Sequence, residues 1–192
     1  MQPPTIGAQY EGAISISPKG VGYVKIRDLG ITVEVPREAL NRAFHHDNVR
    51  VEVTDLPKDE NPKGKVVDII RRSKIGYAGT LSYENGAHCI VSNDGRMYTP
   101  ITIAQEKLSG AKQGDKVFCA ITDWPDPMKE PLGEVVRVLG KPLENNAEMV
   151  ALALEKGFDD QYPIEVTDEA HAIKARGITE EEKVNRRDFR TT

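Results

Sequence analysis

Residues 123 to 140 read DWPDPMKEPLGEVVRVLG, and this stretch separates two kinds of sequence. Before it lie short apolar or alternating runs divided by Gly, Asn, Asp and Pro, the pattern of short β-strands and turns. The stretch itself holds a loop with three prolines and one last apolar run, residues 134–139. After Gly140 the apolar residues recur at helical spacing. We therefore predict a mainly β protein that ends in a short α-helical segment.

The β-rich part contains two sets of five expected strands. The first set covers residues 12–17, 21–26, 31–35, 49–53 and 63–71, with one or two helical turns expected at 37–44. The second set covers residues 76–82, 87–92, 97–103, 116–122 and 134–139. In both sets a longer connection follows the third strand, as in a five-stranded Greek-key barrel of the OB type. We predict two tandem five-stranded OB/cold-shock barrels, although the two halves are too different for a sequence repeat.

Three short helices are expected after Gly140. Asn145 with Glu148 has the spacing of a capping box, and Gly157 is a helix stop. The apolar residues expected along one side of this first helix are Met149, Val150, Leu152, Ala153 and Leu154.

The second expected helix begins at Pro163 and ends near Gly177, and Thr179 with Glu182 caps the third. This organisation predicts a flexible tail at 1–10, a first barrel at 11–74, a second barrel at 75–141 and a helical linker at 142–192.

The composition is that of an ordinary soluble protein, with 39% hydrophobic and 29% charged residues. No apolar run approaches the length of a membrane span, and the first residues lack the pattern of a secretion signal. Cys89 and Cys119 are isolated, so we expect buried small hydrophobic residues and no disulfide or metal site. A cytoplasmic protein without a membrane partner is expected.

The net charge of -4 conceals a gradient along the chain. Residues 1–74 carry 12 Lys and Arg against 10 Asp and Glu, whereas residues 141–192 carry 8 against 12. A basic group in the first third permits a local phosphate-binding path, and a solvated charged face is the alternative. This group consists of Lys63, Lys65, Arg71, Arg72 and Lys74.

Several motifs in the same order resemble the N-terminal part of ribonuclease R-type exoribonucleases, in the ribonuclease II superfamily. Residues 124–140 are similar to the second cold-shock domain of that family, through Trp-Pro, Pro-x-Gly and the Val-Leu-Gly ending. Residues 19–24, KGVGYV, are similar to the nucleic-acid-binding box of its first cold-shock domain. Residues 33–36 and 46–49 fall where that domain has its third strand and the start of its fourth. Residues 186–190, RRDFR, resemble the segment that leads into the catalytic domain.

The resemblance implies the single-stranded RNA-binding portion of a hydrolytic 3′-to-5′ exoribonuclease. RNA would be fed to a catalytic domain, of the same chain or separately encoded, that begins beyond Thr192 and binds magnesium through aspartates. The chain itself is expected to hold no catalytic residue, metal site or cofactor. Asp159-Asp160 lacks the further carboxylates of a two-metal site, and His45-His46 is expected in a surface turn.

Two other functions remain open from the sequence. The chain could have nuclease activity of its own, or it could be a scaffold that docks a catalytic or ribosome-associated partner through its acidic helical tail.

The expected RNA-binding face lies on the second strand, where alternation places Lys19, Val21 and Tyr23 on one side. Barrels that bind single strands stack bases on outer aromatic rings beside cations. Val21 and Glu34 depart from the cold-shock pattern, which has aromatic residues at both places, so we expect weak binding or binding mainly through Lys and Arg. For Tyr23 the alternative is a ring at the edge of the core. The predicted RNA-binding residues are Lys19, Tyr23, Lys25, Arg37, Arg71, Arg72, Tyr77, His88 and Arg96.

Overall fold

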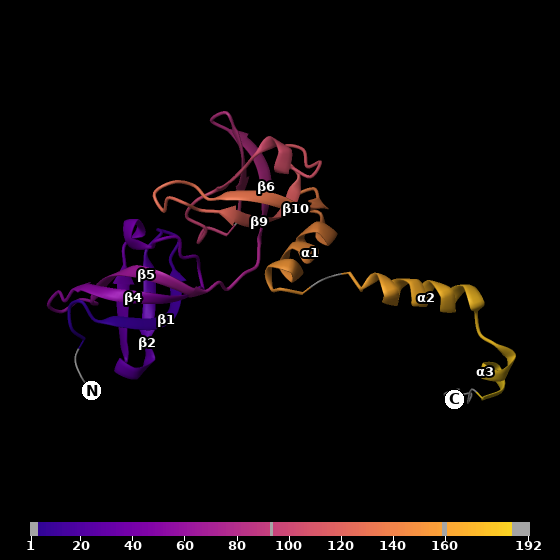
Figure 1. Cartoon of the computed structure of the whole chain (residues 1–192), viewed down its shortest axis with the longest axis horizontal. Helices are drawn as coiled ribbons and strands as arrows, with labels where there is room; N and C mark the ends of the chain where they lie inside the picture. Colours follow the sequence, from indigo (N-terminus) through magenta and orange to yellow (C-terminus); the bar gives the residue numbers. More distant parts are fainter. Residues whose placement is uncertain (1–3, 93, 159–160, 186–192) are drawn as a thin grey trace. The chain divides into compact units, whose positions relative to one another are not determined.

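The structure is a computed structural model that describes residues 4–92, 94–158 and 161–185. The chain divides into two compact units, Met1–Phe158 and Asp159–Thr192. The first unit holds two closed five-stranded barrels and the helix α1 (Asn145–Glu155), as Figure 1 shows. The second unit holds α2 (Ile164–Arg176) and α3 (Glu180–Asn185). The predicted architecture, two tandem barrels followed by short helices, is confirmed.

The first barrel closes in the order β1-β2-β3-β5-β4. Its strands are β1 (Gln9–Ile16), β2 (Gly22–Ile26), β3 (Ile31–Val35), β4 (Asn48–Asp55) and β5 (Lys63–Arg71). All neighbouring pairs are antiparallel except β3 and β5, whose short parallel pairing closes the barrel. Alternate β-branched side chains fill the interior, and each fully buried one stabilises the fold by about 1.5–3 kcal/mol. These include Ile14, Ile16, Val24, Val33, Val35, Val49, Val51 and Val53.

The second barrel repeats this topology. Its strands are β6 (Tyr77–Glu84), β7 (Ala87–Val91), β8 (Ile101–Ile103), β9 (Lys116–Asp123) and β10 (Leu132–Gly140). The circular order β10-β8-β7-β6-β9 is that of the first barrel, and a parallel pair, here β8 and β10, again closes it. The predicted tandem architecture therefore holds at the level of strand order.

A glycine permits the closure of each barrel near the start of its fifth strand. A Cβ on Gly64 would lie 2.7 Å from the carbonyl oxygen of Glu52. A Cβ on Gly133 would lie 2.7 Å from the carbonyl oxygen of Ala120. Backbone cannot yield as a flexible side chain does, so only glycine allows these strands to approach so closely.

Two predicted elements are shorter in the structure. The strand predicted at 97–103 is confined to Ile101–Ile103, and Pro100 before it has no N–H to donate to a ladder. Tyr98, predicted within that strand, instead packs against the cores of both barrels. The helical turns predicted at 37–44 reduce to a single 3₁₀ turn, Arg37–Ala39.

Helix α1 packs on the second barrel through alanines. Ala147 and Ala151 are buried, and Ala151 lies in a small cluster with Ala78 and Phe118. The predicted apolar side is right for Leu154, which packs against this cluster, and wrong for Met149 and Leu152, which are 63% and 59% exposed. Small alanine side chains let the helix approach the strands closely.

The ends of α1 differ in how well the sequence predicted them. The predicted capping box is wrong: Glu144 is the N-cap, and the Glu148 carboxylate accepts a hydrogen bond from Lys116 Nζ at 2.9 Å. Gly157, with φ of 80°, ends the helix as predicted, and the N–H of Phe158 donates to the carbonyl of Ala153.

The second unit has the helices predicted for it. Thr179 and Glu182 form the expected reciprocal capping box, in which the Thr179 N–H donates to Glu182 Oε2 at 2.8 Å and the Glu182 N–H donates to Thr179 Oγ1 at 3.3 Å. Neither α2 nor α3 has a buried residue. Asp159-Asp160 and the 186–190 motif lie outside the described residues. No described helix is long and apolar enough to cross a membrane.

Candidate nucleic-acid interface

The outer face of β2 has the predicted side-chain alternation. Gly22 and Val24 are buried, whereas Tyr23 is half-buried and Lys25 is exposed. Lys19 is exposed in the turn that precedes the strand. Neither Lys19 nor Lys25 forms an ion pair within the described residues. These ammonium groups therefore remain free to bind an anion beside the Tyr23 ring.

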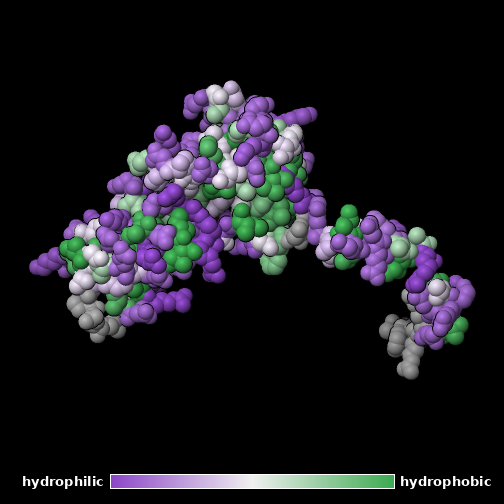
Figure 2. Space-filling model, viewed as in Figure 1, coloured by the Kyte–Doolittle hydropathy of each residue, from purple (hydrophilic) through white to green (hydrophobic). Residues whose placement is uncertain are grey.

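The neighbours of Tyr23 explain why this face departs from an aromatic platform. Tyr23 lies opposite Ser15 on β1 and opposite Glu34 on β3. Glu34 is only half-buried, and no described cation pairs with it. Its carboxylate repels a phosphate brought to Tyr23. Figure 2 shows a mostly hydrophilic surface on the visible face of this barrel, with separate hydrophobic patches.

The predicted cations Arg71 and Arg72 have different surroundings. Arg72 Nη1 binds Asp47 Oδ2 at 2.6 Å and donates to the carbonyl of Arg42 at 2.7 Å. Asp47 is fully buried. Arg71 is exposed and forms no ion pair in the described part of the chain. Arg72 therefore stabilises the fold through its ion pair with Asp47, whereas the charge of Arg71 is available to bind a ligand.

The Arg72–Asp47 pair has an equivalent in the second barrel. Asp47 and Asp115 each stand before or at the start of a fourth strand, and each accepts the N–H of the residue three positions earlier at 2.8 Å. Each also pairs with the residue that follows its fifth strand, Arg72 or Lys141. The hydrogen bond from Lys141 is the main cause of the lowered pKa of Asp115. Each barrel therefore ties the end of its fifth strand to the start of its fourth.

Phe44 inserts from the first barrel into the core of the second. It is 3% exposed, and its ring centroid lies 4.8 Å from that of Tyr77, 5.2 Å from that of Trp124 and 5.7 Å from that of Tyr98. Arg72 lies over the Phe44 ring, with its guanidinium carbon 5.6 Å from the centroid.

Two more arginines bridge the barrels. Arg37 donates to the carbonyl of Tyr98 at 2.6 Å, and Arg42 donates to that of Trp124 at 3.0 Å. Arg37 remains exposed and can still face solvent, but it has this structural contact.

Tyr77 is 7% exposed and belongs to the core of the second barrel. Its ring is therefore not placed to stack on a base. Burial raises the pKa of its hydroxyl well above the usual value, and this hydroxyl has no hydrogen-bond partner among the described residues.

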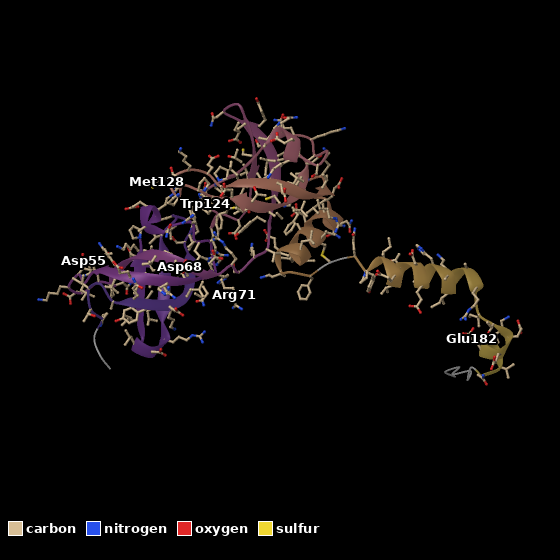
Figure 3. The ribbon with its side chains drawn as sticks, viewed as in Figure 1. Asp55, Asp68, Arg71, Trp124, Met128 and Glu182 are labelled. Atoms are coloured by element: carbon tan, nitrogen blue, oxygen red, sulfur yellow. The ribbon has the colours of Figure 1, made fainter. Side chains whose placement is uncertain are left out.

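A cleft of about 600 Å³ lies beside this inter-barrel contact. Figure 3 shows Asp68 and Arg71 on the first barrel and Trp124 on the second. The cations that line the cleft are Arg42, Arg71, Arg72 and Lys74, and exposed aliphatic side chains of Ile70 and Ile75 lie among them. The carboxylates of Asp68 and Asp123 also line the cleft, so its four cationic side chains outnumber two anionic ones.

The remaining predicted residues lie on the second barrel. His88 on β7 packs edge-on against Tyr83 at 4.9 Å, and its Nε2 lies 2.8 Å from Gln105 Oε1. Arg96 is exposed in the turn between β7 and β8 and forms no ion pair within the described residues. The structure therefore brings Arg71 and Arg72 together at the cleft, and leaves Tyr23 and His88 on different barrels.

The sequence reasoning missed Phe44, Arg42 and the pairing role of Asp47. Only the position of Asp47 before a fourth strand, shared with Asp115, gave a local signal. No group of three or more His, Cys, Asp or Glu that could hold a metal occurs in the described residues. Cys89 and Cys119 are buried free thiols, as predicted, and burial raises the pKa of Cys119 to about 12.

Comparison with known proteins agrees with this geometry. A cold shock domain family matches residues 90–163. Ribonuclease R of Thermotoga maritima is 29% identical over 181 residues, which cover 93% of this chain and 25% of that protein. The chain is a relative of ribonuclease R. It spans about a quarter of the length of the ribonuclease R proteins that it matches first.

Solved structures share the fold. RNase R of Mycoplasma genitalium, in complex with ribose-methylated single-stranded RNA, matches 85% of this chain and 26% of its own with a TM-score of 0.71 and 20% identity. Yeast Ssd1, a pseudonuclease, matches 78% of this chain and 25% of its own with a TM-score of 0.64 and 16% identity. These likenesses show that the tandem-barrel arrangement is shared with ribonuclease R.

Proposed function

We propose that this chain binds single-stranded RNA as the RNA-binding part of a ribonuclease R-type 3′-to-5′ exoribonuclease. In that role it delivers the strand to a catalytic domain of the kind present in its longer relatives. The relationship to ribonuclease R and the cold shock domain match support the RNA-binding role. The proposal needs no cofactor in this chain, because stacking and the release of counterions supply the binding free energy.

The observation that carries the proposal is the free charge around Tyr23. Lys25 has the same outward alternation as Tyr23 on β2, Lys19 is exposed in the turn before this strand, and no described carboxylate pairs with either lysine. Tyr23 and Lys25 are two residues apart on β2, so their Cα atoms are separated by about 7 Å along the β-strand. This spacing suits an RNA nucleotide whose base stacks on the Tyr23 ring while a phosphate binds the Lys25 ammonium group. Arg71 at the cleft offers a further phosphate contact.

The test uses two substitutions with opposite expected effects on RNA affinity. Lys25→Ala removes a phosphate contact, so RNA affinity should fall and its salt dependence should become shallower by about 0.7 in the log–log slope. Glu34→Gln removes the carboxylate opposite Tyr23, so RNA affinity should rise. Lys58→Ala is the matched control, because Lys58 is an exposed loop lysine without an ion pair in the described residues.

The measurement is fluorescence anisotropy with a labelled oligouridylate at several salt concentrations. Equal affinities for the Lys25→Ala, Glu34→Gln and Lys58→Ala proteins would remove the β2 face from the proposal. If the unsubstituted protein binds no RNA at low salt, the RNA-binding function itself is refuted.

A second candidate function is a docking module, and one observation favours it. Helix α2 has 13 residues and none of them is buried, although Val166 and Ile173 are apolar. Isolated helices of this length are marginal in water, so packing against a partner would stabilise it. Truncation after Phe158 keeps α1 and separates the two functions: it should leave RNA affinity unchanged and abolish binding to a separately expressed catalytic domain. Retained binding would refute docking through α2.

A further inference from the structure

A small recess lies where three segments of the first unit meet. Its volume is about 30 Å³, close to that of one water molecule. It is lined by His45 from the first barrel, by Lys74 from the connection between the barrels, and by Ser92, Asp94 and Arg96 from the second barrel. Met97 and the pair at the centre of the inter-barrel contact, Phe44 and Tyr77, complete the lining.

The hydrogen bonding of His45 fixes its tautomer. The N–H of Ile16 donates to His45 Nδ1 at 2.8 Å, so Nδ1 is the acceptor and the ring proton resides on Nε2. No described residue bonds with Nε2. Neutral His45 therefore keeps one N–H donor that the protein does not use.

Arg96 and Ser92 also have unused donors, whereas the Asp94 carboxylate only accepts hydrogen bonds and already accepts the N–H of Arg96 at 3.0 Å. The Arg96 guanidinium forms no ion pair or hydrogen bond within the described residues. The Ser92 hydroxyl accepts the N–H of Asp94 at 3.1 Å, and its own proton stays free. Lys74 is paired with Glu155 at 2.9 Å and so is partly neutralised. The buried Tyr77 hydroxyl lacks a partner among the described residues.

We propose that this recess is a phosphate-binding subsite for the RNA backbone, formed by His45, Arg96 and Ser92 across the two barrels. One non-bridging phosphate oxygen fits the recess, and the Arg96 guanidinium covers the rest of the phosphate from its rim. This inference rests on the proposed RNA-binding function and assigns it a site between the two barrels. Because both barrels contribute donors, the subsite is complete only when Phe44 is inserted.

The neutral form of His45 is the form that the fold stabilises. Its pKa is lowered, first by burial and then by His46, Arg96 and Lys74, while Asp94 opposes them. Protonation would place a second proton on Nδ1, which accepts the N–H of Ile16. The neutral ring therefore donates to the phosphate from Nε2, and Ser92 and Arg96 supply the other donors.

The test compares His45→Asn with His46→Asn in the full chain. His45→Asn keeps an acceptor near the Nδ1 position for the Ile16 N–H and removes the Nε2 donor. His46 is exposed and has φ of 71°, and its ring centroid lies 3.8 Å from that of His45 with the ring planes inclined by 50°. His46→Asn is therefore a matched control that suits a positive φ. Arg96→Ala removes the rim cation and keeps the backbone N–H that bonds to Asp94.

The measurement is the affinity for an oligouridylate at pH 8, where the His45 ring is neutral, with NMR of that ring. The His46→Asn protein should bind as tightly as the unsubstituted protein, and RNA should shift the ring signals of His45. His45→Asn and Arg96→Ala should each weaken binding about tenfold, because each loses a hydrogen bond to a charged group.

Equal RNA affinity of the His45→Asn and unsubstituted proteins, or His45 ring signals that RNA does not change, would overturn the subsite and leave the RNA-binding function standing. No RNA binding by the unsubstituted protein would overturn both.

Discussion

Replacing Arg72 by methionine tests whether this arginine holds the barrels together, in contrast to its neighbour Arg71. Arg72→Met keeps an unbranched stem over the Phe44 ring and removes the charge that pairs with Asp47. Asp47 is fully buried and would retain only the N–H groups of Phe44 and Ser73, at 2.8 and 2.9 Å. The perturbation therefore leaves a buried carboxylate without its counter-charge.

The expected cost follows from this burial. Removing one partner of a buried ion pair costs about 3–5 kcal/mol. The Arg72 side chain is 36% exposed, so water weakens the pair and the expected loss is about 2–3 kcal/mol of unfolding free energy. Arg71→Met should change the unfolding free energy by less than about 0.5 kcal/mol, because Arg71 is exposed and unpaired within the described residues.

Urea unfolding followed by the fluorescence of Trp124 measures both losses. Trp124 is the only tryptophan, is 6% exposed, and lies against Phe44, so its signal reports on the inter-barrel contact. Asp47→Asn combined with Arg72→Met removes both charges and should recover part of the stability. RNA affinity should show the reverse order: Arg71→Met weakens it, and Arg72→Met changes it little under conditions where the protein is folded.

An Arg72→Met protein as stable as the unsubstituted one would refute the structural role of the pair. The double variant gives a second way to refute this role. If adding Asp47→Asn to Arg72→Met lowers the unfolding free energy as much as Asp47→Asn does alone, the two residues are not coupled. If Arg72→Met lost RNA affinity while remaining fully stable, Arg72 would be an RNA contact as the sequence first suggested.

Two further predictions concern the contact between the barrels and its equivalent pair in the second barrel. Phe44→Ala should cost about 3–5 kcal/mol and separate the unfolding of the two barrels into two transitions in calorimetry, because three rings lose their central partner; a single unchanged transition would contradict this. Lys141→Ala should raise the pKa of Asp115 toward its usual value, as measured by NMR titration, and cost no more than about 1 kcal/mol, since Lys141 is 60% exposed. The lowered pKa of Asp115 stabilises the fold at pH values above the pKa of the unfolded state, and this stability is lost as the pH falls through the folded-state pKa. Lys141→Ala should therefore make the unfolding free energy fall less steeply at acid pH. If neither this pH dependence nor the Asp115 pKa changes, Lys141 is not the cause of the lowered pKa.

The strands were predictable because their cause is local. The structure has β3 at Ile31–Val35 and β5 at Lys63–Arg71, the ranges predicted from short apolar or alternating runs between turn residues. Pro36 marks the end of β3 in the sequence because it cannot donate to the ladder. Barrel order followed from the longer third connection, which recurs in both halves.

The contact between the barrels was not predictable, because its partners are distant in sequence. Arg71 and Arg72 look alike in the sequence, and only the buried Asp47, 25 positions from Arg72, distinguishes them. The sequence predicts Tyr77 as an RNA-binding residue, but β6 begins where Phe44 enters the core and Tyr77 is buried there. For α1, a hydrophobicity pattern favours the long side chains of Met149 and Leu152, whereas the contact surface selected the small Ala147 and Ala151.

The two Asp–cation pairs show how a duplicated barrel acquired different neighbours. Each pair ties the start of the fourth strand to the residue after the fifth, and the chain leaves each barrel at this point. After Arg72 it leads directly into the second barrel, and Phe44 beside the pair inserts into the core of that barrel. After Lys141 it leads into α1, whose Glu148 binds Lys116 beside the equivalent pair. The same end of each barrel is therefore covered by the element that follows it in the chain. The outer face of β2 takes no part in these contacts, so binding residues there can change without loss of the contact between the barrels.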